Sequence, residues 1–259
     1  MLHTLWMNVF YEPLYNALFF LVSVVPKADI GIAVILLTIL VKIVLFPISK
    51  KSIVSQMALK KLEPELNQIK KQFPDKQIQA QKTMEVYKKN NVNPFSGCLL
   101  ILLQLPVIFA LYRVFMHGID GTYDALYAFV QPPEALNTLF LGMIDVVGIH
   151  SIGVALAVAV TQFLQLYIAT KDQVAPIKTT EKPNFQEDFA RSMTTQMKYV
   201  LPVVLFFVSY KLSVALGLYF ITTNIMTILQ ELYIRKTVFS KFSENKPDII
   251  DVSVTPTKN

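Results

Sequence analysis

Cysteine, glycine and histidine are scarce in this sequence. A single cysteine, Cys98, among 259 residues excludes a disulfide framework and a metal site built from several cysteines. Eight glycines without a strict repeat exclude a collagen-like chain. The three histidines, His3, His117 and His150, have no partner at the spacing of metal ligands. Because a glycine-rich phosphate loop is also missing from the sequence, we expect no metal, no cofactor and no intrinsic nucleotide hydrolysis.

Charge is scarce as well, since 16% of the residues are charged, 53% are hydrophobic and the mean hydropathy is +0.46. Soluble domains carry about 25% charged residues. A helix of about 20 residues matches the ~30 Å hydrocarbon core of a bilayer. The apolar runs do not alternate with polar residues, which disfavours a membrane barrel. The sequence therefore predicts an all-α integral membrane protein with five transmembrane helices, at 30–49, 95–116, 150–169, 198–212 and 214–234.

The placement of lysine and arginine predicts the orientation of these spans. The segment 50–94 holds ten lysines and four acidic residues, whereas 118–149 holds four acidic residues and no basic ones. The segments 170–198 and 235–259 hold five basic residues each. Five spans put the three basic segments on one side, so we expect an outer N-terminus and a cytoplasmic C-terminus. The remaining predicted segments are an outer loop at 117–149, a cytoplasmic loop at 170–197 and a disordered cytoplasmic tail at 235–259.

Residues 1–29 have two interpretations. No basic residue precedes Lys27, so a cleaved secretory signal fits poorly. Apolar residues recur at a spacing of three to four, which favours an amphipathic helix lying in the outer interface. The alternative is a sixth span, which the charge distribution disfavours. The recurring residues are Leu14, Leu18, Leu21, Val22 and Val25.

The basic segment 50–94 has the pattern of a helical hairpin with a turn at 73–75, where Pro74 and Asp75 follow Phe73. One interpretation is a cytoplasmic arm that lies near phospholipid headgroups or ribosomal RNA. The other is a solvated amphipathic hairpin that merely satisfies the positive-inside rule. Charge alone does not separate the two interpretations.

Lys42 lies inside the first predicted span. A lysine at such a depth costs about 2.5–3.5 kcal/mol on insertion scales, which suggests water, a partner or a function. The alternative is that its ammonium reaches the inner interface, about 10 Å away along the helix. Thr38 is one turn earlier on the same helical face. Both interpretations of Lys42 remain open on composition grounds.

Other polar residues are predicted inside the spans. Gln104 lies near the middle of the second span, and Gln162 and Gln165 lie in the third. Each alone is typical of contacts between membrane helices, and together with Lys42 they could line a water-filled groove. Four further residues share one face of the last span: Phe220, Asn224, Thr227 and Glu231.

Five blocks of sequence, in order along the chain, carry a specific pattern. The most specific block pairs Asn-Pro-Phe-Ser-Gly-Cys-Leu at 93–99 with Gln-Leu-Pro-Val-Ile-Phe-Ala-Leu-Tyr at 104–112. The other blocks are 31–38 with 42–47, 62–65, 201–202, and 217–219 followed by Asn224 and Gln230. Together and in this order, the five blocks resemble the YidC family of membrane protein insertases, and the similarity runs across roughly residues 5–235.

The resemblance implies a hydrophilic groove that is open to the cytoplasm and to lipid and closed to the outside. It places a positive residue in the groove at Lys42, where the family usually has arginine, and a groove-facing residue at Thr38. Phe220 stands where many members carry tyrosine. No catalytic residue is expected. The candidate groove residues are Lys42, Thr38, Gln104, Gln162, Phe220, Asn224 and Thr227.

The function implied by the resemblance is the insertion of nascent membrane proteins into a bacterial plasma membrane, without nucleotide. The implied partners are nascent membrane proteins and the lipid bilayer, with the ribosome and the Sec translocon as further candidates, no DNA, and a monomer as the working unit. One alternative is a small-solute transporter or channel, which would predict an internal repeat that the sequence lacks. Another is a membrane enzyme centred on Cys98 or a histidine.

Overall fold

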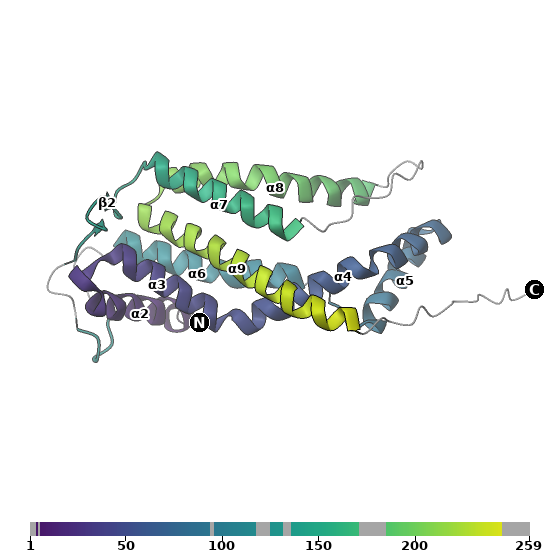
Figure 1. Ribbon diagram of the computed structural model, residues 1–259, viewed down its shortest axis with the longest axis horizontal. Helices are drawn as coiled ribbons and strands as arrows, with labels where there is room; N and C mark the ends of the chain where they lie inside the picture. The colour runs from purple at the N-terminus through teal and green to yellow at the C-terminus, as the bar shows by residue number, and fades with distance from the viewer. Residues whose placement is uncertain are drawn as a thin grey trace, which may run out of the picture.

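The computed structural model describes residue 4 and residues 6–93, 96–117, 125–131, 136–170 and 185–244. Side chains in these ranges are described except at 70, 76, 96–103, 116, 117, 185–196 and 238–244. This part of the chain forms a long bundle of helices with one short antiparallel pair of strands (Figure 1).

The bundle has two distinct ends, which Figure 1 shows on the right and the left. Helices α4 and α5 project from one end, here named the hairpin end, and strands β1 and β2 lie at the other, the strand end. In chain order the elements are η1 (Met7–Tyr11), α2 (Glu12–Val24), η2 (Pro26–Ala28), α3 (Ile30–Val44), α4 (Phe46–Gln72), α5 (Lys76–Lys89), α6 (Ser96–His117), β1 (Leu139–Phe140), β2 (Ile144–Asp145), α7 (Ile152–Thr170), α8 (Phe185–Lys211) and α9 (Val214–Glu244).

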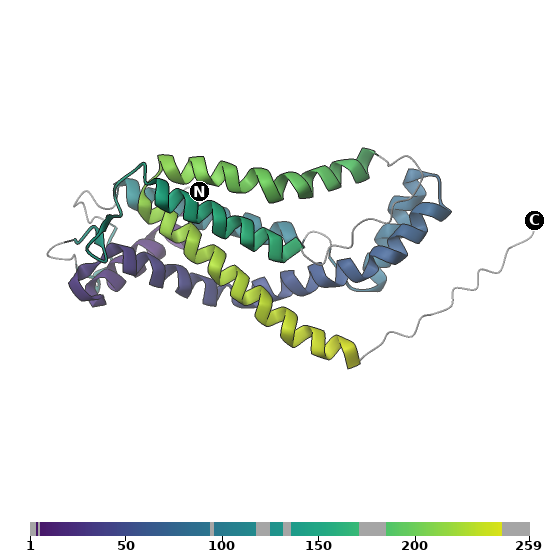
Figure 2. The ribbon, with the colours of Figure 1, turned by 45° about the horizontal axis from the view of Figure 1, so that its top comes forward.

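Helix α9 is the central element of the bundle. It packs against α7 on one side and against α3 on the other, and it also contacts α4, α6 and α8. Figure 2 shows it crossing the bundle diagonally, from the strand end to the hairpin end. Side chains on different faces of α9 can therefore meet α3, α6 and α7.

Helix α3 has defined signals at both ends. At its start, Asp29 Oδ1 accepts a hydrogen bond from the Ile32 N–H at 3.1 Å, which is the usual N-cap arrangement. At its end, Leu45 separates α3 from α4, whose second residue is Pro47. Proline has no N–H and clashes with the preceding turn of a continuous helix. The two helices are accordingly bent by 61° relative to each other.

The hairpin formed by α4 and α5 turns at residues 73–75, where the sequence pattern placed the turn. Asp75 caps α5 by accepting the Gln77 N–H at 2.7 Å. Ile53, Ile69 and Val86 are buried in this part of the molecule, and burial also raises the pKa of the Tyr87 hydroxyl. The hairpin thus has a small apolar core of its own beneath a surface rich in lysine.

The strand end is closed by the loop that carries β1 and β2. The Ile30 N–H donates to the Asn137 carbonyl at 3.1 Å, and the N–H groups of Val214 and Ala215 donate to the carbonyls of Gly148 and Val146 at 3.0 and 2.9 Å. The loop therefore satisfies backbone groups at the starts of both α3 and α9. These orphan N–H groups would otherwise need water or a side chain.

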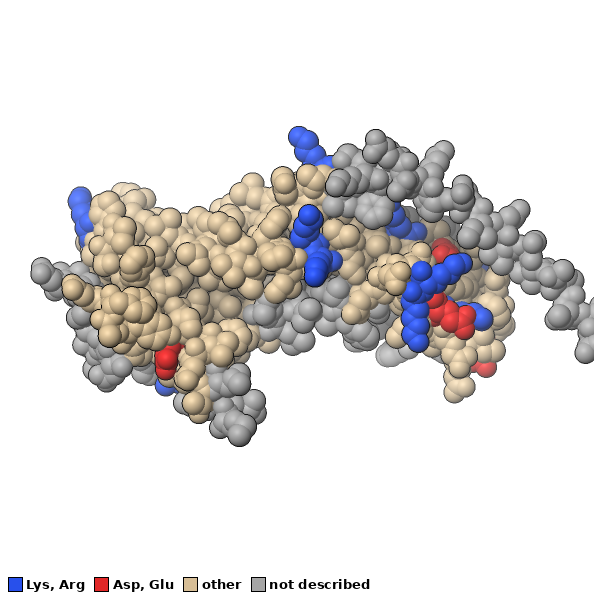
Figure 3. Space-filling model, turned by 90° about the horizontal axis from the view of Figure 1, so that it is seen from below, with Lys and Arg blue, Asp and Glu red and all other residues tan. Residues whose placement is uncertain are grey.

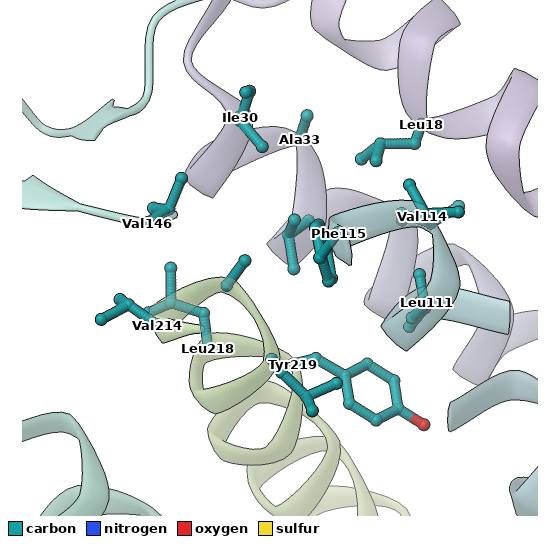
Figure 4. Packing of buried hydrophobic residues seen from close by; sticks show 14 of the residues in the cluster. Leu18, Ile30, Ala33, Leu111, Val114, Phe115, Val146, Val214, Leu218 and Tyr219 are labelled. Atoms are coloured by element: carbon teal, nitrogen blue, oxygen red, sulfur yellow. The ribbon is translucent and has the colours of Figure 1, made fainter. Parts of the chain in front are cut away.

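The main hydrophobic core lies toward the strand end. Figure 4 shows side chains from α2, α3, α6 and α9 meeting there, among them Leu18, Ala33, Val114 and Leu218. Val146 of the strand-end loop is fully buried against the same cluster. For the membrane protein that the sequence predicts, lipid is as apolar as these side chains, so the cluster stabilises the bundle through close van der Waals packing between the helices.

Toward the hairpin end the buried positions become polar. In α3 the apolar cluster ends at Leu37, and Thr38 and Lys42 follow it as buried residues. In α7 it ends at Val158, and Gln162 is the next buried position. In α9 the buried polar residues that follow Phe220 are Thr222, Asn224, Gln230 and Glu231. The interior is therefore divided between an apolar half and a polar half.

The exterior of the bundle is apolar over a large area. A stripe on α7 has the four-residue spacing of one helical face, and each member is 45–64% exposed: Ile152, Leu156, Val160 and Leu164. Among the described residues, α7 is the one helix long and apolar enough to cross a bilayer by itself. The bent pair formed by Ile30–Val44 and Phe46–Ile69 passes the same test when taken together. Within α6, the segment Gln104–Phe115 is a shorter apolar stretch.

Two helices extend beyond the predicted spans. Helix α8 begins at Phe185, whereas the fourth span was predicted from 198, and α9 continues to Glu244, whereas a disordered tail was predicted from 235. The expectation of disorder is thus wrong for 235–244, and residues 245–259 lie outside the described residues. Hydropathy marks only the apolar part of a helix, whereas lysine, arginine, glutamate and glutamine continue it readily into a polar region.

Gly217 allows α9 to approach its neighbours closely. A Cβ atom at this position would lie 2.4 Å from Val154 Cγ1 of α7 and 3.0 Å from Ser209 Oγ of α8. At 2.4 Å the two carbon atoms would clash, so the Val154 side chain or its helix would have to shift. Gly153, on α7, has no neighbouring atom within 4 Å of the corresponding position, so a side chain there meets open space.

We therefore expect Gly217→Ala to destabilise the bundle by about 1–3 kcal/mol, the usual cost of overpacking. Gly153→Ala is the matched control, because it makes the same chemical change in a helix without a clash and removes the entropic cost of glycine. Thermal unfolding in nanodiscs should show a lowered midpoint for the first variant and an unchanged or raised midpoint for the second. Equal midpoints would contradict the close packing at Gly217.

Candidate functional site

Lys42 is buried in the polar half of the bundle and is only 7% exposed. Its Nζ donates a hydrogen bond to Thr227 Oγ1 of α9 at 3.0 Å. Among the residues that the structure describes, this is the only hydrogen bond of its side chain, and it makes no ion pair. A buried ammonium with one neutral acceptor is incompletely compensated, because a lysine has three N–H donors.

Two threonines flank Lys42 in different ways. Thr227 Oγ1 donates to the Thr223 carbonyl at 2.7 Å, so its hydroxyl hydrogen is used within α9 and its lone pairs face Lys42. Thr38 is 2% exposed and donates to the Val34 carbonyl at 2.7 Å. Thr38 shares the face of α3 that carries Lys42. The two hydroxyls give this part of the interior a polar lining.

Gln230 is a second α9 residue that binds Lys42. Its Nε2 donates to the main-chain carbonyl of Lys42 at 3.0 Å, and Gln230 itself is 7% exposed. From the sequence, Gln230 was only part of the resemblance to the YidC family and was not among the candidate groove residues. Its spacing of three residues from Thr227 was the available signal, since such residues share a helical face.

The predicted residue Gln104 meets α9 at Tyr219. Its side-chain amide donates to the Tyr219 hydroxyl, and Tyr219 is only 1% exposed. Phe220 belongs instead to the apolar cluster, with its ring tilted against that of Tyr219 at a centroid distance of 5.5 Å. The aromatic hydroxyl on this segment therefore comes from the residue before Phe220, which sequence reasoning did not select.

The remaining two candidates are Asn224, which lies on α9 and contacts α7, and Gln162, which lies on α7. Asn224 Nδ2 donates to Thr161 Oγ1 of α7 at 3.2 Å, whereas Gln162 donates to Gln165 within α7 at 3.0 Å. The structure thus brings Lys42 and Thr227 into direct contact. Gln104 and Asn224 make separate polar contacts, Gln104 with Tyr219 of α9 and Asn224 with Thr161 of α7. Four of the seven candidates take part in three separate polar contacts with α9, whereas Thr38 and Gln162 bond within their own helices and Phe220 lies in the apolar cluster.

A further charged cluster lies at the hairpin end. Glu231 and Arg235 form an ion pair at 2.8 Å, with side chains 9% and 17% exposed. Arg235 also donates to the carbonyls of Ile168 and Ala169, at 3.2 and 3.3 Å, and Lys60 Nζ of α4 donates to the Ala169 carbonyl at 3.0 Å. The C-terminus of α7, with its unpaired carbonyls and negative dipole end, is therefore bound by two cations.

Many of the charged side chains that the structure describes lie toward this end (Figure 3). In Figure 3 most blue and red atoms lie between the middle of the bundle and the hairpin end, and an area of other residues separates them from the few charged atoms at the strand end. Cys98 lies in α6 among the side chains outside those described, and His150 packs edge-on against Tyr210 at 5.0 Å.

Removing Arg235 should destabilise the hairpin end strongly. Arg235→Leu leaves the buried Glu231 carboxylate unpaired, which costs roughly 3 kcal/mol for such pairs. The double variant Arg235→Leu/Glu231→Leu removes both charges and should recover much of that loss. Thermal unfolding in nanodiscs is the measurement.

The exposed pair of Lys82 and Glu85 provides the control. Their side chains are 44% and 63% exposed at the same 2.8 Å separation, so Lys82→Leu should change the unfolding midpoint little. A comparable loss in both single variants, or no recovery in the double variant, would argue that burial of the Glu231–Arg235 pair is unimportant.

The apolar exterior, the helical bundle and the polar half of its interior define an all-α integral membrane protein. A family model described as 60Kd inner membrane protein matches residues 20–241. The chain belongs to this family, and the resemblance predicted from sequence is confirmed.

Particular relatives are named membrane protein insertase YidC. The chain is 32% identical to the Fusobacterium nucleatum relative over 233 residues, which cover 89% of this chain and 98% of the relative. It is 28% identical to the Oceanobacillus iheyensis relative over 243 residues, covering 92% and 86% of the two chains. The match to the Geobacter sp. relative is 29% identical over 234 residues and covers 90% of this chain but only 38% of the relative.

A solved structure supports the same fold. The crystal structure of an active YidC insertase with its first transmembrane domain resolved matches with a TM-score of 0.56 and 21% sequence identity. The match covers 88% of this chain and 46% of the solved chain. At this level of identity the likeness concerns the arrangement of the helices.

Proposed function

We propose that this chain is a membrane protein insertase, which transfers nascent membrane proteins into the lipid bilayer of a bacterial cell. Membership of the 60Kd inner membrane protein family supports this proposal. The Fusobacterium relative supports it as well, because it is named as an insertase and the match with this chain covers 98% of its length. Other relatives are much longer than this chain, so only functions of the shared segment are carried over.

The observation that carries the proposal is the burial of Lys42 in the polar half of the bundle. Its ammonium bonds one neutral hydroxyl, so among the described residues two of its three donors remain for water or for an incoming carboxylate. A membrane protein that only needed a stable interior would gain by replacing such a group with an apolar one. A positive charge held inside the molecule instead suits the attraction of acidic substrate segments.

The proposed mechanism uses a half-open hydrophilic groove beside Lys42. A nascent chain carries an apolar stretch and a short polar tail, and desolvation makes it costly for the tail to cross lipid unaided. A wet groove shortens the dry path, and Lys42 attracts acidic residues of the tail transiently. The apolar stretch then enters lipid, where burial contributes about 0.8 kcal/mol per CH₂ group. This driving force requires no nucleotide.

The hairpin of α4 and α5 is proposed to receive the substrate at the mouth of the groove. Two apolar residues of α5, Ile78 and Met84, are 40% and 46% exposed in an otherwise lysine-rich element. Such a surface can bind an apolar nascent segment while its charges keep it at the membrane interface.

The proposed topology has five spans, an outer N-terminus and a cytoplasmic C-terminus. The hairpin end then faces the cytoplasm, and the N-terminal helix lies in the outer interface. We propose a monomer as the working unit, with the ribosome and the Sec translocon as further candidate partners.

The first test is insertion by the purified protein. Proteoliposomes that contain it should protect a one-span or two-span substrate from added protease in the absence of nucleotide. Protein-free liposomes give the background, and efflux of a trapped solute is measured in parallel. Protection at the background level would contradict the proposal, and solute flux without insertion would favour a channel.

The second test concerns the charge of Lys42. Lys42→Ala should reduce insertion of a substrate with an acidic outer tail by about tenfold, which corresponds to about 1.4 kcal/mol. Lys42→Arg keeps the charge and should retain most of the activity. The matched substrate carries the same apolar stretch with a neutral tail, and its insertion should change little in either variant.

The neutral-tail substrate controls for unfolding of the Lys42→Ala variant. An equal loss for both substrates would assign Lys42 a structural role. Full activity of Lys42→Ala on the acidic tail would show that the charge is not used.

A further inference from the structure

The break between α3 and α4 changes the hydrogen bonding of the Lys42 backbone. In a continuous helix the Lys42 carbonyl would accept from the N–H of the residue four positions later. Here α3 ends at Val44, and the Leu45 N–H bonds the Val41 carbonyl at 2.9 Å. The Lys42 carbonyl is one of the last carbonyls of α3, which lose their helical partners at a helix end.

Gln230 supplies a donor to this carbonyl from another helix. The distance from Gln230 Nε2 to the Lys42 oxygen is 3.0 Å, and both residues are 7% exposed. A buried carbonyl left without a donor is costly, so the amide has a clear local role. It also links α9 to α3 at the point where the chain bends by 61° into the hairpin.

Helix α9 thus holds Lys42 at two points. Thr227 binds the ammonium and Gln230 binds the main chain of the same residue. The lysine side chain has four flexible torsions, so a bond at its tip alone leaves the position of the helix free. The bond to the backbone fixes the origin of the side chain, and the bond to Nζ fixes its end.

We propose that Gln230 is a positioning residue, which fixes the α3–α4 break against α9 and thereby holds the Lys42 ammonium where an acidic substrate segment can reach it. Gln230 acts through Lys42 and does not contact the substrate. The link to substrate rests on the proposed insertase function. The link to the helix break rests only on the contacts between α3, α4 and α9.

The test uses Gln230→Met, which preserves side-chain length and removes the N–H donor. Gln230→Glu is a second variant of the same shape, and its ionised form also lacks a donor. The matched control is Thr222→Val, because the Thr222 hydroxyl is buried on the same helix but donates to the Leu218 carbonyl within α9, at 2.8 Å.

The first measurement is independent of insertion. Spin labels at Met84 of α5 and Leu164 of α7, both partly exposed, report the placement of the hairpin against the bundle in a Cys98→Ser background. Both Gln230 variants should shift or broaden the distance distribution, and Thr222→Val should leave it unchanged. An unchanged distribution in the Gln230 variants would overturn the positioning role whatever their insertion activity.

The second measurement is insertion of the paired acidic-tail and neutral-tail substrates. Gln230→Met should lower insertion of the acidic tail by about threefold and leave the neutral tail unchanged. In a Lys42→Ala background, adding Gln230→Met should cause no further loss. Equal losses for both substrates, or additive losses in the double variant, would overturn the link between Gln230 and Lys42.

The two measurements separate this inference from the proposed function. If the label distances change while Lys42→Ala itself inserts both substrates normally, the proposed use of the lysine charge fails and the structural role of Gln230 at the break remains.

Discussion

The hydrogen bond between the buried ammonium of Lys42 and the hydroxyl of Thr227 joins α3 to α9 in the polar half of the bundle, and it is the central interaction of that half. A charge in such a place must be compensated by hydrogen bonds, because desolvation is costly. The described residues offer it one hydroxyl and no carboxylate, while Glu231, on the same helix as that hydroxyl, is already paired with Arg235. Among the described residues, Lys42 therefore has a hydroxyl as its acceptor and no carboxylate as its counter-ion.

The distribution of apolar and polar burial fits this arrangement. The strand end is held by an apolar core and by backbone hydrogen bonds from the loop that crosses the starts of α3 and α9. The hairpin end is held by polar contacts and cations at the C-terminus of α7. The two ends are therefore held by different interactions, apolar packing at the strand end and polar contacts at the hairpin end.

Much of the fold was predictable because hydropathy and charge act over short stretches of sequence. The all-α membrane class, the turn at 73–75, the tight connection between α8 and α9 and the family all follow from local patterns. The lengths of α8 and α9 did not, because apolar runs mark only the part of a helix that needs an apolar environment. Lys42 and Thr227 were both candidate groove residues from the sequence, but nothing in the sequence indicated that Thr227 would accept the hydrogen bond of the Lys42 ammonium.

Composition and spacing are properties of the chain alone, and they are enough to predict a helical membrane protein with one lysine inside an apolar run. The groups that meet that lysine depend on the tertiary structure. The bend at Leu45 leaves the Lys42 carbonyl without a donor from its own helix, and the diagonal path of α9 brings the Gln230 amide to this carbonyl. The same path brings Tyr219 to Gln104. These pairs join residues far apart in the chain, so their contacts depend on how helices cross, which no local pattern encodes.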